Sequence, residues 1–192
     1  MIRHQYNDLT IEVIDEPTYK AASADNNFNY EKHYFGDGAT EYPTSRHGVK
    51  MYRDDQIIDS CILIGSGGAT GVHPNSSLVD NDRLVICCCD TVFSLSLPDL
   101  ELRWKTKADP ATCFEIYRLQ DDYITHGEIE IARIDGEGNI KWRFGGSDIF
   151  VSFDNDDAFK LNTDHIALTD FYKIQYKINF DGTVIWRSNK PG

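Results

Sequence analysis

The residues best suited to chemistry lie in and just after a glycine-rich segment, residues 65–71 (GSGGATG). Glycine-rich loops bind phosphates when their backbone N–H groups converge at the start of a helix, usually beside a lysine. Here the segment continues as VHPN, with neither the lysine nor an amphipathic helix. We therefore interpret it as a tight bend. A ligand-binding loop is the alternative, and its polar groups would be Thr70, His73 and Asn75.

Two further patterns invite comparison with metal sites. Cys87 and Cys89 share one face of a predicted strand, but the sequence has no C-x-x-C or H-x-x-x-H pair to supply a zinc ligand set. Residues 154–157 (DNDD) have the charge of a calcium loop without its downstream glycine and bidentate glutamate. We predict a cluster of buried thiols, a solvated acidic turn, no metal and no other cofactor.

The sequence also lacks a recognisable catalytic pattern. Serine, histidine and aspartate occur without a nucleophile elbow or another local signature. Glu128 and Glu130 are two residues apart on a predicted strand and share a face, which suits an acid–base pair and equally suits alternation on a solvated face. We predict that the protein is not an enzyme.

Composition narrows the choice of partner and compartment. The 192 residues carry a formal net charge of −12. Nucleic acid and anionic membranes are therefore not expected as partners, whereas a basic protein is expected. The alternative is that the acidity only maintains solubility. The five cysteines are odd in number and include a triplet, which indicates buried thiols in a reducing compartment. Because no secretory signal and no membrane span are evident, we expect a cytoplasmic protein.

Internal repetition is the strongest structural signal. Trp104, Trp142 and Trp186 each close a similar stretch, in which a turn-like or acidic element precedes a short alternating run. They recur about every 40 residues, the range of propeller blades. An aspartate opens an apolar run at the same interval, at Asp82, Asp122 and Asp164. Since each indole sits at one fixed strand position, we expect it to pack between adjacent blades; an aromatic binding platform is the alternative.

The repeats indicate how the chain is organised. We expect an N-terminal β/loop segment at residues 1–56 and three repeats at 57–105, 106–146 and 147–192. Short strands joined by Gly/Asp turns predict antiparallel all-β structure. The expected strands are 60–64, 83–90, 91–97 and 101–105; then 113–118, 122–126, 128–134 and 139–143; then 150–153, 165–169, 172–178 and 183–187.

Residues 133–142 (RIDGEGNIKW) carry the motif of the repeat most clearly, followed by residues 177–186 (KINFDGTVIW) and, more weakly, 95–104. The motif resembles the blades of pyrroloquinoline-quinone-type and WD-type propellers. The resemblance implies a propeller-like array of about three four-stranded antiparallel blades and says little about chemistry. Because propellers have at least four blades, we expect residues 1–56 to complete or close the array. An open array and pairing of two chains are the alternatives.

The chain as a whole resembles the immunity proteins of bacterial polymorphic toxins and contact-dependent growth inhibition systems in size, acidity and lack of a catalytic signature. This resemblance implies a cytoplasmic protein that neutralises a cognate basic toxin, expected to be a nuclease, by stoichiometric occlusion. The acidic turns would steer the partner, and the residues expected to do so are Asp80, Asp82, Asp121, Asp122, Asp154, Asp156 and Asp157. The alternatives are a propeller-like scaffold for protein assembly and a small-ligand binder or enzyme that uses the glycine-rich loop.

Overall fold

The computed structural model describes residues 1–152 and 157–189, and all regular elements within these ranges are β-strands, arranged in four sheets. Asp154 and Asp156 lie outside the described residues. The structure has, in these ranges, no helix long and apolar enough to cross a membrane.

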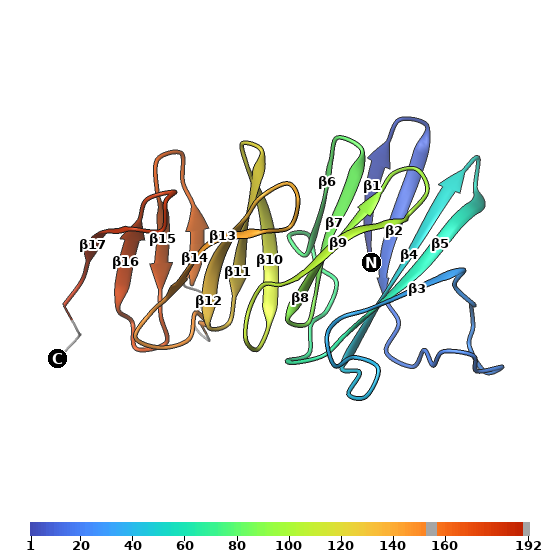
Figure 1. Cartoon of the computed structure of the whole chain (residues 1–192), viewed down its shortest axis with the longest axis horizontal. Coiled ribbons are helices and arrows are strands. Elements are labelled where there is room, and N and C mark those ends of the chain that lie inside the picture. The colour runs from blue at the N-terminus through green and yellow to red at the C-terminus, as the bar shows by residue number, and fades with distance from the viewer. Residues whose placement is uncertain (153–156, 190–192) are drawn as a thin grey trace.

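Three of the sheets are four-stranded antiparallel meanders, each in the order of the chain. Figure 1 shows them side by side, as blades of one array. The first sheet has strands β6 (Ser77–Asp80), β7 (Arg83–Cys88), β8 (Thr91–Ser96) and β9 (Leu102–Lys107). The second has β10 (Cys113–Leu119), β11 (Asp122–Gly127), β12 (Glu130–Ile134) and β13 (Ile140–Gly145). The third has β14 (Phe159–Leu161), β15 (Ile166–Thr169), β16 (Gln175–Ile178) and β17 (Val184–Arg187).

Residues near the N-terminus form a fourth sheet at the start of the array. Its strands are, in spatial order, β1 (Ile2–Tyr6), β2 (Leu9–Asp15), β4 (Ser45–Arg53), β5 (Gln56–Gly65) and β3 (Lys32–Phe35). All pair antiparallel except β3, which adds to β5 in parallel. The long connections around β3 cover the sheet's outer face, where Tyr19 and Tyr30 pack with Ile62 and Ile64.

The expected fold class, an all-β propeller-like array of antiparallel blades, is confirmed. The N-terminal segment adds a sheet to the array but does not close it, because β1–β5 and β14–β17 lie at opposite ends (Figure 1). Residues 60–64 form a strand as expected, but this strand, β5, belongs to the N-terminal sheet and not to the first repeat, because the turn at Asp54 and Asp55 pairs it with β4. One strand expectation was wrong. Residues 150–152 are not a strand: Phe150 is apolar because its ring packs in the core.

Side chains between neighbouring sheets form the core. One layer lies between the N-terminal sheet and β6–β9, a second between β6–β9 and β10–β13, and a third between β10–β13 and β14–β17. The central strands β7, β8 and β11 are almost entirely buried, whereas the outer strands β9 and β13 alternate between half-buried and exposed residues. This alternation is the period-two pattern of a strand with one face toward a neighbour.

Aromatic side chains on the outer strands join each blade to the next. Trp104 donates its Nε1–H to the carbonyl of Gly136 at 3.0 Å, and Trp142 donates to the carbonyl of Phe180 at 2.9 Å. The two indoles lie on Gly138 and Gly182, whose φ angles are 88° and 80°. A Cβ at either glycine would lie 2.7 Å from the indole, so these turns require glycine for both conformation and space.

The last tryptophan lacks such a contact. Trp186 is 47% exposed, because no sheet follows β17 in the described chain. Tyr34 on β3 makes an equivalent contact at the other end of the array, donating to the carbonyl of Leu100 at 3.0 Å; Leu100 also has a positive φ. Packing between blades is therefore the role of Trp104 and Trp142, and not of Trp186.

The outer face of the last sheet is more polar than the matching face of the sheet before it. In β10–β13, the cross-strand row that ends at Trp142 contains Tyr117, Ile124 and Arg133. The corresponding row in β14–β17 contains Lys160, Ala167, Lys177 and Trp186. Lys160 and Ala167 stand where the preceding sheet has Tyr117 and Ile124, so this row offers less apolar area for packing.

Candidate functional site

Eight of the hairpin connections within the four sheets lie along one end of the array, which we call the turn rim, and the other three, residues 89–90, 128–129 and 170–174, lie at the opposite end. The rim connections are residues 7–8, 54–55, 81–82, 97–101, 120–121, 135–139, 162–165 and 179–183, and they follow the upper edge of Figure 1. Each contains at least one carboxylate and none contains lysine or arginine. The carboxylates are Asp8, Asp54, Asp55, Asp82, Asp99, Glu101, Asp121, Asp135, Glu137, Asp164 and Asp181.

Three of the predicted partner-binding residues come together on the turn rim. They line one hollow of about 350 Å³, whose acidic residues are Asp80, Asp121, Asp122, Asp135 and Glu137. Arg83 and Arg118 line the same hollow, so its charge is partly neutralised from within. Adjacent blades contribute these groups, which is why repeats 40 residues apart in the sequence can build one surface.

Asp80 and Asp122 have structural roles, which corrects the expectation that they contact a partner. Asp80 is buried, accepts a hydrogen bond from Tyr123 at 2.7 Å and forms an ion pair with Arg118. Asp122 is also buried and forms ion pairs with Arg133 and Lys141. Both carboxylates lie at the ends of strands, where Asp80 holds a basic side chain of the next blade and Asp122 holds two of its own blade.

Asp82 and Asp121 are exposed on the turn rim, as a partner contact requires. Arg103 forms an ion pair with Asp82, and this hydrogen bond lowers the pKa of the Asp82 carboxyl, so the group stays charged at neutral pH. The Asp121 carboxylate is in none of the hydrogen bonds or ion pairs found among the described residues.

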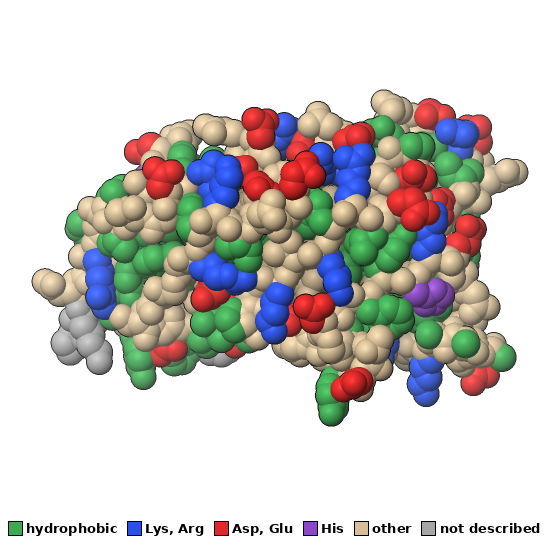
Figure 2. All heavy atoms as spheres, in the orientation of Figure 1, with side chains coloured by type: hydrophobic (Ala, Val, Ile, Leu, Met, Phe, Trp, Pro, Cys, Tyr) green, Lys and Arg blue, Asp and Glu red, His purple; other side chains and the backbone are tan. Residues whose placement is uncertain are grey.

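Glu137 and Asp181 are rim carboxylates that sequence reasoning missed. Both are exposed, and each occupies the turn between the third and fourth strands of its blade. The sequence did hold a signal for these two residues, since both belong to the turn motif whose glycine, Gly138 or Gly182, packs against a tryptophan of the preceding blade. Figure 2 shows carboxylates along the upper edge of the molecule with arginine and lysine side chains between them.

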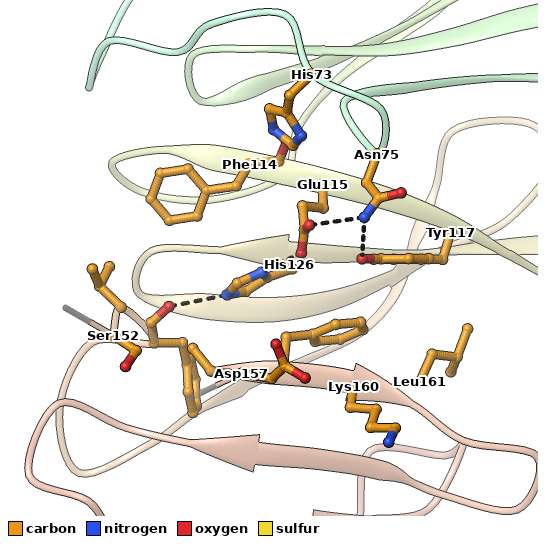
Figure 3. A pocket seen from close by; sticks show the side chains of 14 residues that line it. His73, Asn75, Phe114, Glu115, Tyr117, His126, Ser152, Asp157, Lys160 and Leu161 are labelled. Carbon is orange, nitrogen blue, oxygen red and sulfur yellow. Dashed lines mark hydrogen bonds and ion pairs between the residues drawn. The ribbon is translucent and has the colours of Figure 1, made fainter. Parts of the chain in front are cut away.

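Asp157, His73 and Asn75 lie elsewhere, in a cleft of about 830 Å³ over the inner strands β10 and β14 (Figure 3). We call it the inner cleft. It is lined in addition by rings and by polar groups that include Phe114, Glu115, Tyr117, His126 and Phe159. The predicted acidic residue and the predicted loop residues thus share a site that no sequence motif connected.

The polar side chains of the inner cleft bind one another. Asn75 donates to Glu115 at 3.1 Å and to the Tyr117 hydroxyl at 3.0 Å. His126 places Nδ1 2.7 Å from the Glu115 carboxylate and Nε2 2.9 Å from the carbonyl of Phe150. Both ring nitrogens of His126 are thus engaged by oxygen atoms. The imidazole also stacks on Phe159, with centroids 5.1 Å apart.

This pair predicts a dependence of stability on pH. Burial alone would raise the pKa of Glu115, but hydrogen bonds from His126 and Asn75 outweigh it and lower the pKa below its ordinary value. Because the pKa of Glu115 is lower in the folded state, its ionised carboxylate stabilises the folded protein at pH values above roughly 4.3. This stabilisation disappears as the pH falls through the folded-state pKa. In urea titrations, the stability lost in Glu115→Gln should therefore be largest near neutral pH and shrink below pH roughly 4. A constant difference across this range would contradict the assignment.

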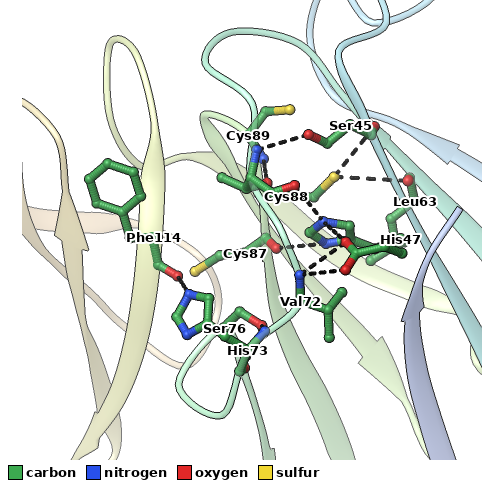
Figure 4. A network of polar contacts seen from close by, with 12 residues as sticks. Ser45, His47, Leu63, Val72, His73, Ser76, Cys87, Cys88, Cys89 and Phe114 are labelled. Carbon is green, nitrogen blue, oxygen red and sulfur yellow. Dashed lines mark hydrogen bonds and ion pairs between the residues drawn. The ribbon is translucent and has the colours of Figure 1, made fainter. Parts of the chain in front are cut away.

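Thr70 belongs to a packed bend and does not line the inner cleft. Its hydroxyl accepts the N–H of Cys89 at 2.9 Å, and its carbonyl faces Nε2 of the buried His47 at 3.3 Å. The N–H of Gly68 bonds to the carbonyl of Ala111 at 2.9 Å. Figure 4 shows the adjoining network, in which His73 reaches the carbonyl of Phe114. The glycine-rich segment is therefore the tight bend that we expected.

Neither the metal patterns nor the Glu128/Glu130 pair of the sequence forms a convergent site in the part of the chain that is described. The structure there has no group of three or more histidine, cysteine or acidic residues able to hold a metal ion. Glu128 accepts a hydrogen bond from Thr112, and Glu130 forms an ion pair with Arg143.

Neither a family model nor a curated protein matches the sequence. Among solved structures, the chain is similar to the computationally designed Ika8 protein, with a TM-score of 0.52 and 8% identity over 75% of this chain and 45% of that one. BamB from Moraxella catarrhalis gives a TM-score of 0.47 with 12% identity over 77% and 44%. The AfRom2 CNH domain gives 0.46 with 11% identity over 74% and 47%. The chain spans less than half the length of each, and the likeness to Ika8 concerns the fold alone.

Proposed function

We propose that the protein is a bacterial, cytoplasmic immunity protein that binds a basic toxin, a nuclease, and covers its active site in a one-to-one complex. The turn rim is the surface proposed for this contact. The observation that carries the proposal is that every connection on the rim contains a carboxylate and none contains a lysine or arginine.

The geometry of the rim suits such a partner. The carboxylates stand on short hairpins, which the docked tryptophans and buried ion pairs hold in place. A nuclease active site binds phosphates and is therefore cationic. A negative surface steers a cationic partner and raises association rates to about 10⁸–10⁹ M⁻¹s⁻¹ at low salt. The net charge of −12 acts in the same direction at longer range.

The exposed rim carboxylates that make no side-chain ion pair are the proposed contacts. Asp121, Glu137 and Asp181, from the adjacent blades β10–β13 and β14–β17, meet this condition, as do Asp54, Asp55 and Asp99 nearer the N-terminus. Asp82 adds a further carboxylate, which its pairing with Arg103 orients. Asp157 lies in the inner cleft and does not belong to this set.

Co-expression with the basic toxin encoded beside the gene tests the proposal. We expect the wild-type protein to protect the cells. The rim variant Asp121→Asn/Glu137→Gln/Asp181→Asn should lose protection, because it removes three negative charges from exposed side chains with no structural partner. The control variant Asp25→Asn/Glu31→Gln/Glu41→Gln changes the charge equally, on exposed residues of the N-terminal cover, and should protect.

Two results would refute the proposal. Death of cells that contain soluble, folded wild-type protein would exclude immunity toward that toxin. Equal protection by the rim and control variants would show that net charge or another surface is responsible. A rim variant that stays bound to a multiprotein complex, with no effect on toxin killing, would favour a scaffold function.

A further inference from the structure

Cys87 and Cys113 bring two thiols together across the boundary between two blades. Cys87 lies on β7 and Cys113 at the start of β10, and their sulfur atoms are 3.2 Å apart. Both residues are fully buried. Although the two cysteines are 26 positions apart in the chain, the thiols face each other. In Figure 4 the sulfur of Cys87 points toward the strand that carries Phe114, the residue after Cys113.

Backbone hydrogen bonds fix both strands at this point. The N–H of Cys113 bonds to the carbonyl of Cys89 at 2.7 Å, and the N–H of Cys87 bonds to the carbonyl of Ser76 at 2.8 Å. A disulfide has a sulfur–sulfur distance of about 2.03–2.05 Å, so bond formation needs an approach of only about 1 Å. Side-chain rotation can supply this without separating the blades.

We propose that Cys87 and Cys113 are a latent cross-linking site, which forms an intramolecular disulfide between the blades β6–β9 and β10–β13 when the protein meets a peroxide or a small-molecule disulfide. With hydrogen peroxide, one thiolate attacks the peroxide oxygen, giving a sulfenic acid and water. The second thiol then attacks the sulfenic sulfur and releases another water. Two thiols and one peroxide thus yield one disulfide and two waters.

Burial determines when this reaction takes place. Burial and the neighbouring thiol raise the pKa of the Cys87 thiol, so the reactive thiolate forms mainly when the blades separate transiently or while the chain folds. The remaining cysteines are placed differently. Cys61 lies in the core of the N-terminal sheet, and the thiol of Cys88 points to the carbonyls of Ser45 and Leu63.

Refolding the whole chain in a glutathione redox buffer tests the proposal. After alkylation of free thiols and trypsin digestion, we expect peptide 84–103 to be joined to peptide 108–118. The oxidised protein should melt roughly 5–10 °C above the reduced protein, because the cross-link constrains the unfolded chain.

Single cysteine-to-alanine variants identify which two cysteines form the disulfide. Cys87→Ala and Cys113→Ala should each abolish the joined peptides and the melting shift, and the control Cys61→Ala should keep both. The proposal is overturned if wild-type protein refolded under oxidising conditions contains no joined peptides. It is also overturned if the joined peptides persist in Cys87→Ala, which would assign the bond to Cys88 or Cys89.

Discussion

Replacing Trp142 with alanine is expected to lower the free energy of unfolding by about 2–4 kcal/mol, whereas Trp186→Ala should change it by less than about 1 kcal/mol. The two tryptophans hold the same position in successive repeats. Trp142 packs on Gly182 and donates a hydrogen bond to the carbonyl of Phe180, in the core layer between two blades. Trp186 is 47% exposed, and its ring lies 6.0 Å from the Lys177 ammonium.

Urea unfolding followed by fluorescence and circular dichroism measures this difference, provided that the dependence on urea stays the same among variants. Trp186→Ala is the matched control, since it removes the same side chain from the same strand position. Similar losses in the two variants would mean that the outer face of the last blade is covered in solution, contrary to its polar character.

Asp122→Asn is also expected to lower the free energy of unfolding substantially, whereas the neighbouring Asp121→Asn should leave it within about 0.5 kcal/mol of wild type. The Asp122 side chain is 7% exposed and that of Arg133 is 14% exposed, with Oδ2 and Nε 2.5 Å apart. Removing one partner of a buried ion pair costs about 3–5 kcal/mol because the other charge stays buried. Lys141 is half exposed and contributes less, so we expect a loss of about 2–4 kcal/mol.

This pair of variants separates the structural carboxylates from the partner-binding ones. Thermal and urea unfolding of both proteins, under identical salt, gives the comparison. High salt should diminish the effect of Asp122→Asn only slightly, since buried charges are poorly screened. Equal stability of the two variants would show that Asp122 is solvated and therefore available to contact a partner.

The fold was largely predictable because periodic apolar runs and turn residues report on local structure. The interval of Trp104, Trp142 and Trp186 predicted blades, and most strands of the second repeat lie within one or two residues of expectation. The N-terminal sheet was less visible, since β2 and β4 are separated by a long insertion that carries β3. Strand order there depends on contacts distant in sequence, which short-range patterns do not encode.

The candidate site was predictable only in part, because charge alone does not reveal burial. Asp80, Asp82, Asp121 and Asp122 all lie at or beside the turn rim, yet Asp80 and Asp122 are buried in ion pairs with arginine and lysine side chains. Those basic residues are remote in the sequence from their partners and carry no motif. The inner cleft was invisible for the same reason, since Glu115 and His126 meet across a strand pair.

The most direct test of the account is titration calorimetry of the purified protein with the purified basic toxin, made for the wild type, the rim variant and the control variant. The account predicts a one-to-one complex whose affinity falls with rising salt, is unchanged in the control Asp25→Asn/Glu31→Gln/Glu41→Gln and drops at least tenfold in Asp121→Asn/Glu137→Gln/Asp181→Asn, equivalent to about 1.4 kcal/mol or more. Affinity that does not depend on salt, and that is equal in both variants, would contradict binding at the turn rim.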